Sequence, residues 1–139
     1  MHIYFSGIGG TGIGPLSLIA HRAGYDVSGS DKQDSNYIHY LQKQGVGNIH
    51  IGQSYDAIEA VHKAHPIDWF VYSSAVSKEQ ADAPELRFCG EHGIRATRRD
   101  EFLSTFIKEN NLKLIAIAGT HGKTTTTAMM IWLLKQLGI

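Results

Sequence analysis

Residues 6–14 read SGIGGTGIG, and this stretch decides the fold. It contains the pattern G-x-G-x-x-G at Gly7, Gly9 and Gly12, after a strand-forming run and before a helix-forming run. In such a turn the first glycine permits the tight bend and the second lets backbone approach a diphosphate. The third lets the helix pack closely on the strand. The stretch therefore predicts an anion-binding turn at the N-terminus of a helix.

An acidic residue follows at the distance that such a turn requires. Asp31 ends the run VSGSD at 27–31, twenty-two residues after Gly9. An acid at the end of the second strand of these folds bonds a ribose hydroxyl. The alternative is that the glycines only make a tight turn and that Asp31 caps the next helix. The motif alone does not choose among NAD, NADP, FAD and UDP-sugars.

Outward from the turn, strand-like and helix-like segments alternate. The predicted strands are His2–Ser6, Tyr25–Ser28, Asn48–Ile51, Asp68–Tyr72, Ile94–Thr97 and Leu112–Ala118. The predicted helices are Leu16–Arg22, Asn36–Lys43, Ala57–Lys63, Pro84–His92, Asp100–Lys108 and Lys123–Leu137. Alternation of this kind predicts an α/β fold, a Rossmann-like doubly wound five-stranded parallel sheet covered on both faces.

A polar patch, Glu109-Asn110-Asn111, is the predicted domain boundary. Residues 1–108 form the expected Rossmann-like domain. Residues 109–139 hold one strand, a loop and one helix, the start of a second, truncated ATP-binding domain.

The composition excludes several classes of protein. The 139 residues carry 13 basic and 13 acidic side chains, and 42% of them are hydrophobic. Such a chain is globular, and its zero net charge gives no support for nucleic-acid or membrane-surface binding. The single cysteine, Cys89, cannot form an internal disulfide, which favours a cytoplasmic location. Cys89 is expected to be a packing residue.

A second motif lies near the C-terminus. Residues 114–127 read LIAIAGTHGKTTTT, a buried-type strand, a glycine loop and a helix start. Backbone N–H groups of such a loop cradle a triphosphate, Lys123 supplies charge to the β- and γ-phosphates, and Thr124 is placed to ligate Mg²⁺. The loop is shorter than the general phosphate loop, because Ile117 stands where a glycine is usual. The alternative is a threonine-rich helix start after a plain turn.

Two serines and several histidines are weaker candidates. Ser73 and Ser74 follow the fourth predicted strand, where ligands sit in open parallel sheets, but they could equally cap a helix. His121 in the glycine loop is expected to be positional. His62 and His65 have no third ligand at a metal-binding spacing, so zinc is not expected.

Together these motifs resemble the Mur ligase family over essentially the whole chain. The resemblance rests on GIGGTGIG, VSGSD, YSSAV, RRDEFL and AGTHGKTTT, in this order. The last is the most specific, because the shortened phosphate loop is that family's variant. Within the family, the members that join L-alanine to UDP-N-acetylmuramate are the better match, since the ligase that recycles murein tripeptide differs in the glycine turn.

The resemblance implies an enzyme of cytoplasmic peptidoglycan synthesis. ATP phosphorylates the muramic acid carboxylate, the amine of L-alanine attacks the acyl phosphate, and phosphate leaves. The implied UDP-sugar residues are Gly9, Gly10, Thr11, Gly12, Asp31, Ser73 and Ser74. The implied ATP residues are Gly119, Thr120, His121, Gly122, Lys123, Thr124 and Thr125, with Thr124 on Mg²⁺. Arg98 or Arg99 could reach the sugar-nucleotide, or both could be solvated.

The resemblance also sets limits. Gly52-Gln53 stands where the family usually has Gly-His, which leaves that nucleotide contact open. The rest of the ATPase domain and the amino-acid-binding domain are not in these residues, so the chain alone is expected to bind nucleotide but not to ligate. The helix from Lys123 is apolar on nearly every face and is expected to pack on another chain, as in a dimer, or to fray.

The rival interpretations are an NAD(P)-binding domain of an oxidoreductase or sensor, and a non-enzymatic nucleotide-binding module.

Overall fold

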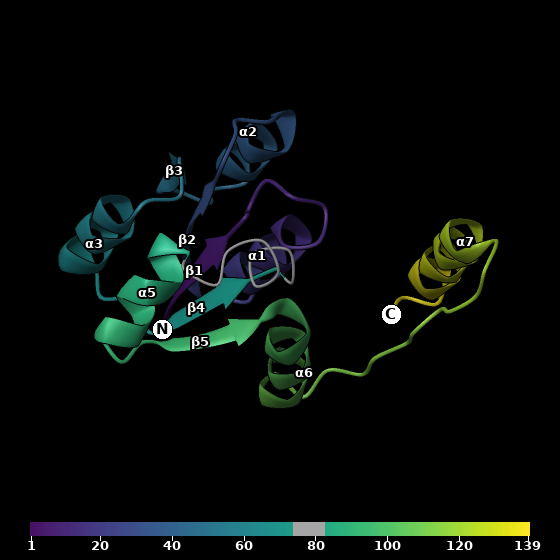
Figure 1. Ribbon diagram of the computed structural model, residues 1–139. Coiled ribbons are helices and arrows are strands. Elements are labelled where there is room, and N and C mark those ends of the chain that lie inside the picture. Colours follow the sequence, from purple (N-terminus) through teal and green to yellow (C-terminus); the bar gives the residue numbers. More distant parts are fainter. Residues whose placement is uncertain (74–82) are drawn as a thin grey trace. The chain divides into compact units, whose positions relative to one another are not determined.

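The computed structural model describes residues 1–73 and 83–139 and contains a parallel sheet of five strands (Figure 1). The strands are β1 (His2–Ser6), β2 (Asp26–Asp31), β3 (Ile49–Ile51), β4 (Trp69–Tyr72) and β5 (Arg95–Arg98). The helices are α1 (Gly14–Arg22), α2 (Asn36–Lys43), α3 (Tyr55–Ala64), α5 (Pro84–Glu91), α6 (Arg99–Glu109) and α7 (Lys123–Gln136).

The order of the strands places the glycine-rich turn at the middle of the sheet. The order is β3-β2-β1-β4-β5, so the chain builds outward from β1 to one side and then returns to build the other side. The predicted doubly wound parallel sheet is confirmed. In such sheets the crevice for a ligand opens at the carboxyl ends of the strands, where the winding direction changes. Here that point lies at Ser6, directly before the turn.

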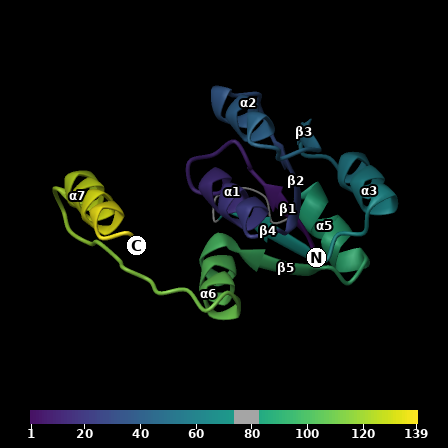
Figure 2. The same ribbon diagram turned by 180° about the vertical axis from the view of Figure 1, so that it is seen from behind.

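Two hydrophobic clusters cover the two faces of the sheet. Along β1, Ile3 and Phe5 enter one cluster and Tyr4 enters the other, as alternation along a strand requires. The first cluster includes side chains of α1 and α6, and the second includes side chains of α3 and α5. Figures 1 and 2, which view the molecule from opposite sides, show these helices around the sheet.

One glycine of β2 is required by the close approach of β1. A Cβ at Gly29 would collide with the carbonyl oxygen of Phe5 and lie 2.9 Å from Cδ1 of Ile8. We expect Gly29→Ala to lower the free energy of unfolding by about 1–3 kcal/mol, because backbone would have to move. Urea denaturation followed by circular dichroism measures this. Gly90→Ala in α5 is the control, since no atom lies within 4 Å of a Cβ there; an equal loss in both variants would contradict the explanation.

Residues Ile107–Ile139 form a separate unit from Met1–Phe106. The helix predicted to begin at Lys123 is confirmed as α7. The predicted strand Leu112–Ala118 is wrong, because these residues are not in a strand. A strand needs a neighbour to receive its backbone hydrogen bonds, and among the described residues no strand pairs with this segment. No helix in the described part of the chain is long and apolar enough to cross a membrane.

Candidate functional site

The glycine-rich turn is held by the end of β2. The N–H groups of Gly7 and Ile8 both donate to the carbonyl oxygen of Ser30, at 2.8 and 3.0 Å. The next amide, Gly9 N–H, donates to Oδ2 of Asp31 at 2.8 Å. Gly7 has φ +80°, which a residue with a side chain rarely adopts. The turn is thus built onto two residues of the neighbouring strand.

This arrangement gives Asp31 a role that the sequence did not show. One carboxylate oxygen orients the turn through Gly9, and the other lies 3.3 Å from the backbone nitrogen of Gln33. A Cβ at Gly9 would lie 3.0 Å from Oδ2 of Asp31 and from the Ile38 side chain, so a larger residue would require these side chains to shift. A carboxylate accepts about four hydrogen bonds, which leaves Asp31 with capacity for a ligand hydroxyl.

Two amides of the turn point to an anion site. Gly10 N–H donates to Gly7, and the N–H groups of Ile13 and Gly14 both approach the carbonyl oxygen of Gly10. The N–H groups of Thr11 and Gly12 have no hydrogen-bond acceptor among residues 1–73 and 83–139. Adjacent amide donors at the start of a helix bind phosphate oxygens.

The side chain of Arg99 lies against this part of the turn. A Cβ at Gly12 would collide with Nη1 of Arg99, and both residues line a hollow of about 250 Å³ with Leu16, Asp100 and Leu103. Arg99 forms no ion pair with an acid in the described parts of the chain, whereas Nε of Arg98 lies 3.4 Å from Oδ1 of Asp100. The first residue of α6 thus brings a guanidinium to Gly12, the second of these two residues.

The predicted role of Gly12 is therefore wrong in one respect. Gly12 makes room for the Arg99 side chain, and the tightest packing at the start of α1 occurs instead at Gly14, against α2 and the turn. A Cβ at Gly14 would collide with the Tyr37 ring and lie 2.7 Å from the carbonyl oxygen of Ile8. The sequence pattern could not separate these two glycines, because the neighbours come from α2 and α6.

A buried carboxylate lies beneath the turn, and the sequence analysis did not identify it. Glu85, in the first turn of α5, is 2% exposed. It accepts hydrogen bonds from the hydroxyls of Tyr4 (3.0 Å), Ser6 (2.6 Å) and Ser30 (2.5 Å). Burial raises the pKa of Glu85, and the three hydroxyl donors oppose that rise. Its position after Pro84 resembles an ordinary acidic residue of a first helical turn, so no sequence signal pointed to burial.

The remaining predicted residues lie around the same strand ends. Nε2 of Gln53, after β3, donates to the Ser6 hydroxyl at 2.8 Å, which attaches the unusual Gly-Gln pair to the network beneath the turn. Ser73 directly follows β4 and is partly exposed. Ser74 lies outside the described residues.

The predicted phosphate loop belongs to the unit Ile107–Ile139. Gly122 has φ +75° and precedes α7, which has no side-chain cap. Nζ of Lys123 donates to the carbonyl oxygen of Gly119 at 2.7 Å, which folds the loop back on itself. The residues 119–125 are all exposed. The uncapped amides, the lysine and the Thr124 hydroxyl have the chemistry to bind a triphosphate with Mg²⁺.

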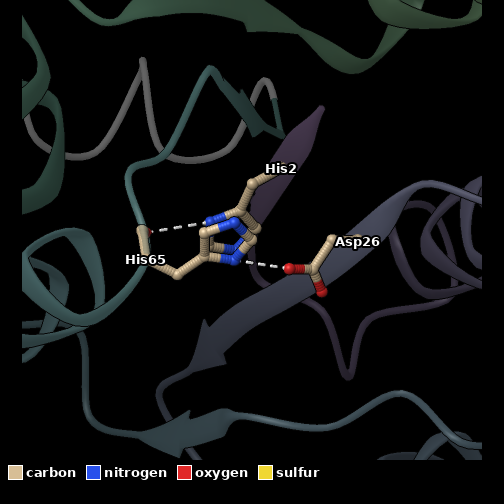
Figure 3. Close-up of side chains that lie close together, drawn as sticks. All are labelled: His2, Asp26 and His65. Carbon is tan, nitrogen blue, oxygen red and sulfur yellow. Dashed lines mark hydrogen bonds and ion pairs between the residues drawn. The ribbon is translucent and has the colours of Figure 1, made fainter.

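A second cluster of ligand-type side chains lies at the opposite, amino-terminal end of the strands (Figure 3). Nδ1 of His65 lies 2.6 Å from Oδ2 of Asp26, and the His65 ring stacks on His2 with centroids 4.7 Å apart. Nδ1 of His2 lies 3.1 Å from the carbonyl oxygen of His65 and therefore donates, while Nε2 accepts from the Ser28 hydroxyl at 2.7 Å. Since both ring nitrogens of His2 are engaged and parallel rings do not converge on one ion, this cluster ties the strand starts together.

The fold and the site define a class. The parallel sheet ordered around β1, with a glycine-rich turn at its switch point, is a Rossmann-like domain. Arg99 lies at that turn, and the amides of Thr11 and Gly12 have no acceptor in the described parts of the chain. The sequence model of the protein family described as "Mur ligase family, catalytic domain" matches residues 2–111. This chain belongs to the Mur ligase family.

Relatives and solved structures support the assignment. The chain is 41% identical over 138 residues to a UDP-N-acetylmuramate–L-alanine ligase of Acidovorax sp. (strain JS42), covering 99% of this chain and 26% of the relative. The UDP-N-acetylmuramate-alanine ligase of Thermotoga maritima superposes with a TM-score of 0.83 and 31% identity, covering 99% of this chain and 30% of that one. A murein peptide ligase of Psychrobacter arcticus gives 0.82 and 35%, covering 99% and 27%. The chain spans about a quarter of the length of the curated relatives that it matches.

Proposed function

We propose that this chain is the UDP-N-acetylmuramate-binding part of an ATP-dependent ligase that joins L-alanine to UDP-N-acetylmuramate. The observation that carries the proposal is the pair of amides at Thr11 and Gly12 beside the guanidinium of Arg99. Amides and a guanidinium are suited to the diphosphate of a nucleotide-sugar, since they supply several donors and a positive charge. The similarity to relatives named as UDP-N-acetylmuramate–L-alanine ligases supports this substrate.

In this proposal each residue has a defined task. The amides of Thr11 and Gly12 and the side chain of Arg99 hold the diphosphate, in the turn that also contains Gly9 and Gly10. Asp31 accepts from a hydroxyl on the uridine side while it orients Gly9. Ser73, directly after β4, contributes a hydroxyl, and Ser74, which lies outside the described residues, is kept as a predicted contact.

The residues of the second unit would hold ATP. Gly119, Thr120, His121, Gly122 and Thr125 surround the phosphates, Lys123 neutralises them, and Thr124 ligates Mg²⁺. The Mg²⁺ ion supplies charge stabilisation for phosphoryl transfer from ATP to the muramic acid carboxylate, with release of ADP. The L-alanine amine then attacks the acyl phosphate and phosphate leaves, so that an amide forms. No residue described above carries a covalent step, and we expect the 139 residues alone to bind without ligating, in a cytoplasmic setting.

Calorimetric titration of the chain with UDP-N-acetylmuramate, NADH and ATP–Mg²⁺ tests the proposal. We expect a response to the UDP-sugar and none to NADH, because the relatives that the chain matches are named as UDP-N-acetylmuramate–L-alanine ligases. Lys123→Ala is the matched control, since it removes the charge offered to ATP and leaves the first unit unchanged. A response to NADH without one to the UDP-sugar would replace the proposal by an NAD-binding domain.

A dimer through α7 remains a prediction, which sedimentation of the chain tests.

A further inference from the structure

The buried carboxylate of Glu85 does not line the hollow beside Arg99, but it lies at the junction of β1 and β2, which hold the turn. It accepts from hydroxyls on β1 (Tyr4 and Ser6) and on β2 (Ser30). These strands pair in register at the same level, since Ser6 lies opposite Ser30. The carboxylate therefore fixes the two strand ends to each other and to the first turn of α5.

The two serines connect Glu85 to the turn, Ser6 through its peptide bond and Ser30 through the hydrogen bonds that its carbonyl oxygen accepts. Ser6 directly precedes Gly7, and the carbonyl oxygen of Ser30 receives the amides of Gly7 and Ile8. Asp31, the next residue, receives the amide of Gly9. Three consecutive amides of the turn therefore depend on where Ser30 and Asp31 lie. The Ser6 hydroxyl also accepts a hydrogen bond from Nε2 of Gln53, so the Glu85 carboxylate orients the loop after β3 through Ser6.

From this geometry we propose that Glu85 is a positioning residue, which orders the glycine-rich turn for diphosphate binding through the hydroxyls of Ser6 and Ser30. The proposal rests on the proposed function for its ligand. It assigns Glu85 no contact with the ligand. A carboxylate suits this task, because its two oxygens accept several hydrogen bonds at once, whereas a neutral amide side chain offers only one accepting oxygen.

The hydroxyl of Tyr4 offers a matched control. It donates to Oε1 of Glu85, the same oxygen that receives Ser30, and it also interacts with the Ser30 hydroxyl. Tyr4 nevertheless projects from the middle of β1, and among the described residues no amide of the turn donates to its backbone. Tyr4→Phe and Ser30→Ala each remove one hydroxyl from this carboxylate. If Glu85 acts on the turn through the serines, only Ser30→Ala and Glu85→Gln should change the turn, while all three variants lose stability.

Two readouts on the folded 139-residue chain test the proposal. The first is hydrogen exchange at the amides of Gly7, Ile8 and Gly9 without ligand. We expect Glu85→Gln and Ser30→Ala to exchange roughly tenfold faster there and Tyr4→Phe to match the original chain, because the broken bonds are to a charged group. The second is the dissociation constant of UDP-N-acetylmuramate, which we expect to rise by roughly tenfold in the first two variants and to stay within about twofold in Tyr4→Phe.

The pH dependence of the dissociation constant adds a test that a purely structural role would not pass. The ionisable groups that face Glu85 are Tyr4, Asp31 and Cys89. Because burial raises the pKa of Glu85, its protonation begins at a higher pH than that of an ordinary glutamate. As pH falls through that range the original chain should lose affinity, and Glu85→Gln should show no such loss.

These experiments distinguish failure of the proposed function from failure of the positioning role of Glu85. If the original chain does not bind the UDP-sugar, the proposed function fails, and exchange at the three amides still decides the positioning role. If Tyr4→Phe perturbs the turn as much as Ser30→Ala does, or if neither changes it, the positioning role is overturned. If Glu85→Gln does not fold, Ser30→Ala against Tyr4→Phe carries the same comparison.

Discussion

Trp69→Ala is expected to lower the free energy of unfolding by about 3–5 kcal/mol. Trp69 is 1% exposed at the first position of β4, and its ring packs on Phe102 with centroids 4.9 Å apart. Its indole N–H donates to the Thr97 hydroxyl at 2.7 Å, and the guanidinium of Arg95 lies 3.9 Å from the ring centroid. Truncation leaves a cavity between the sheet and α6 and a buried hydroxyl without its donor, and both effects reduce stability.

Urea unfolding followed by far-ultraviolet circular dichroism measures this loss without relying on tryptophan fluorescence. The chain offers a matched control, because Trp132 in α7 is 64% exposed. We expect Trp132→Ala to change the free energy of unfolding by no more than about 0.5 kcal/mol. Similar losses in the two variants would show that Trp69 is not the central packing residue of the sheet.

Arg99→Ala is expected to weaken binding of UDP-N-acetylmuramate by roughly 10- to 100-fold. The change removes charge-assisted hydrogen bonds to phosphate, each of which contributes about 1.5–3 kcal/mol. Gly12→Ala should have a similar effect, because the added Cβ would displace the guanidinium from the turn. The fold should survive, since the displaced group is the end of a flexible, exposed side chain.

Calorimetry on the two single variants and the double variant measures their coupling. If both changes act through the guanidinium, the double variant should bind no more weakly than Arg99→Ala alone. Additive losses would instead show that the Cβ of residue 12 blocks the ligand directly. Arg98→Ala is the control, because that side chain lies beside Asp100, and we expect its dissociation constant to stay within about twofold.

Arg98 and Arg99 show which part of the candidate site the sequence predicts and which part needs the structure. Adjacent residues of one type cannot be separated by pattern, and both were open candidates for the ligand. The start of α6 at Arg99 points the two side chains in different directions, so only Arg99 meets Gly12. Similarly, the spacing from Gly9 to Asp31 predicted an acid near the turn, but only the packed strands show its carboxylate accepting the Gly9 amide.

The predicted strand Leu112–Ala118 is a case in which a local sequence pattern predicted an element that the structure does not contain. Its apolar run is typical of a buried parallel strand, but strand formation requires hydrogen bonds from a neighbour, and none of the described strands supplies them. Helix α7 forms as predicted, because a helix satisfies its backbone within itself.

By itself the sequence determined the alternation of strands and helices, the parallel sheet, the glycine-rich turn and the family. These follow from local signals: periodicity, glycine placement and residues at short spacing. The tertiary structure was needed to show that Glu85 is buried beneath the turn, that Gly12 receives Arg99, and that Asp31 accepts the Gly9 amide. The physical reason is that each of these facts depends on contacts between segments 22 to 87 residues apart, which no local pattern encodes.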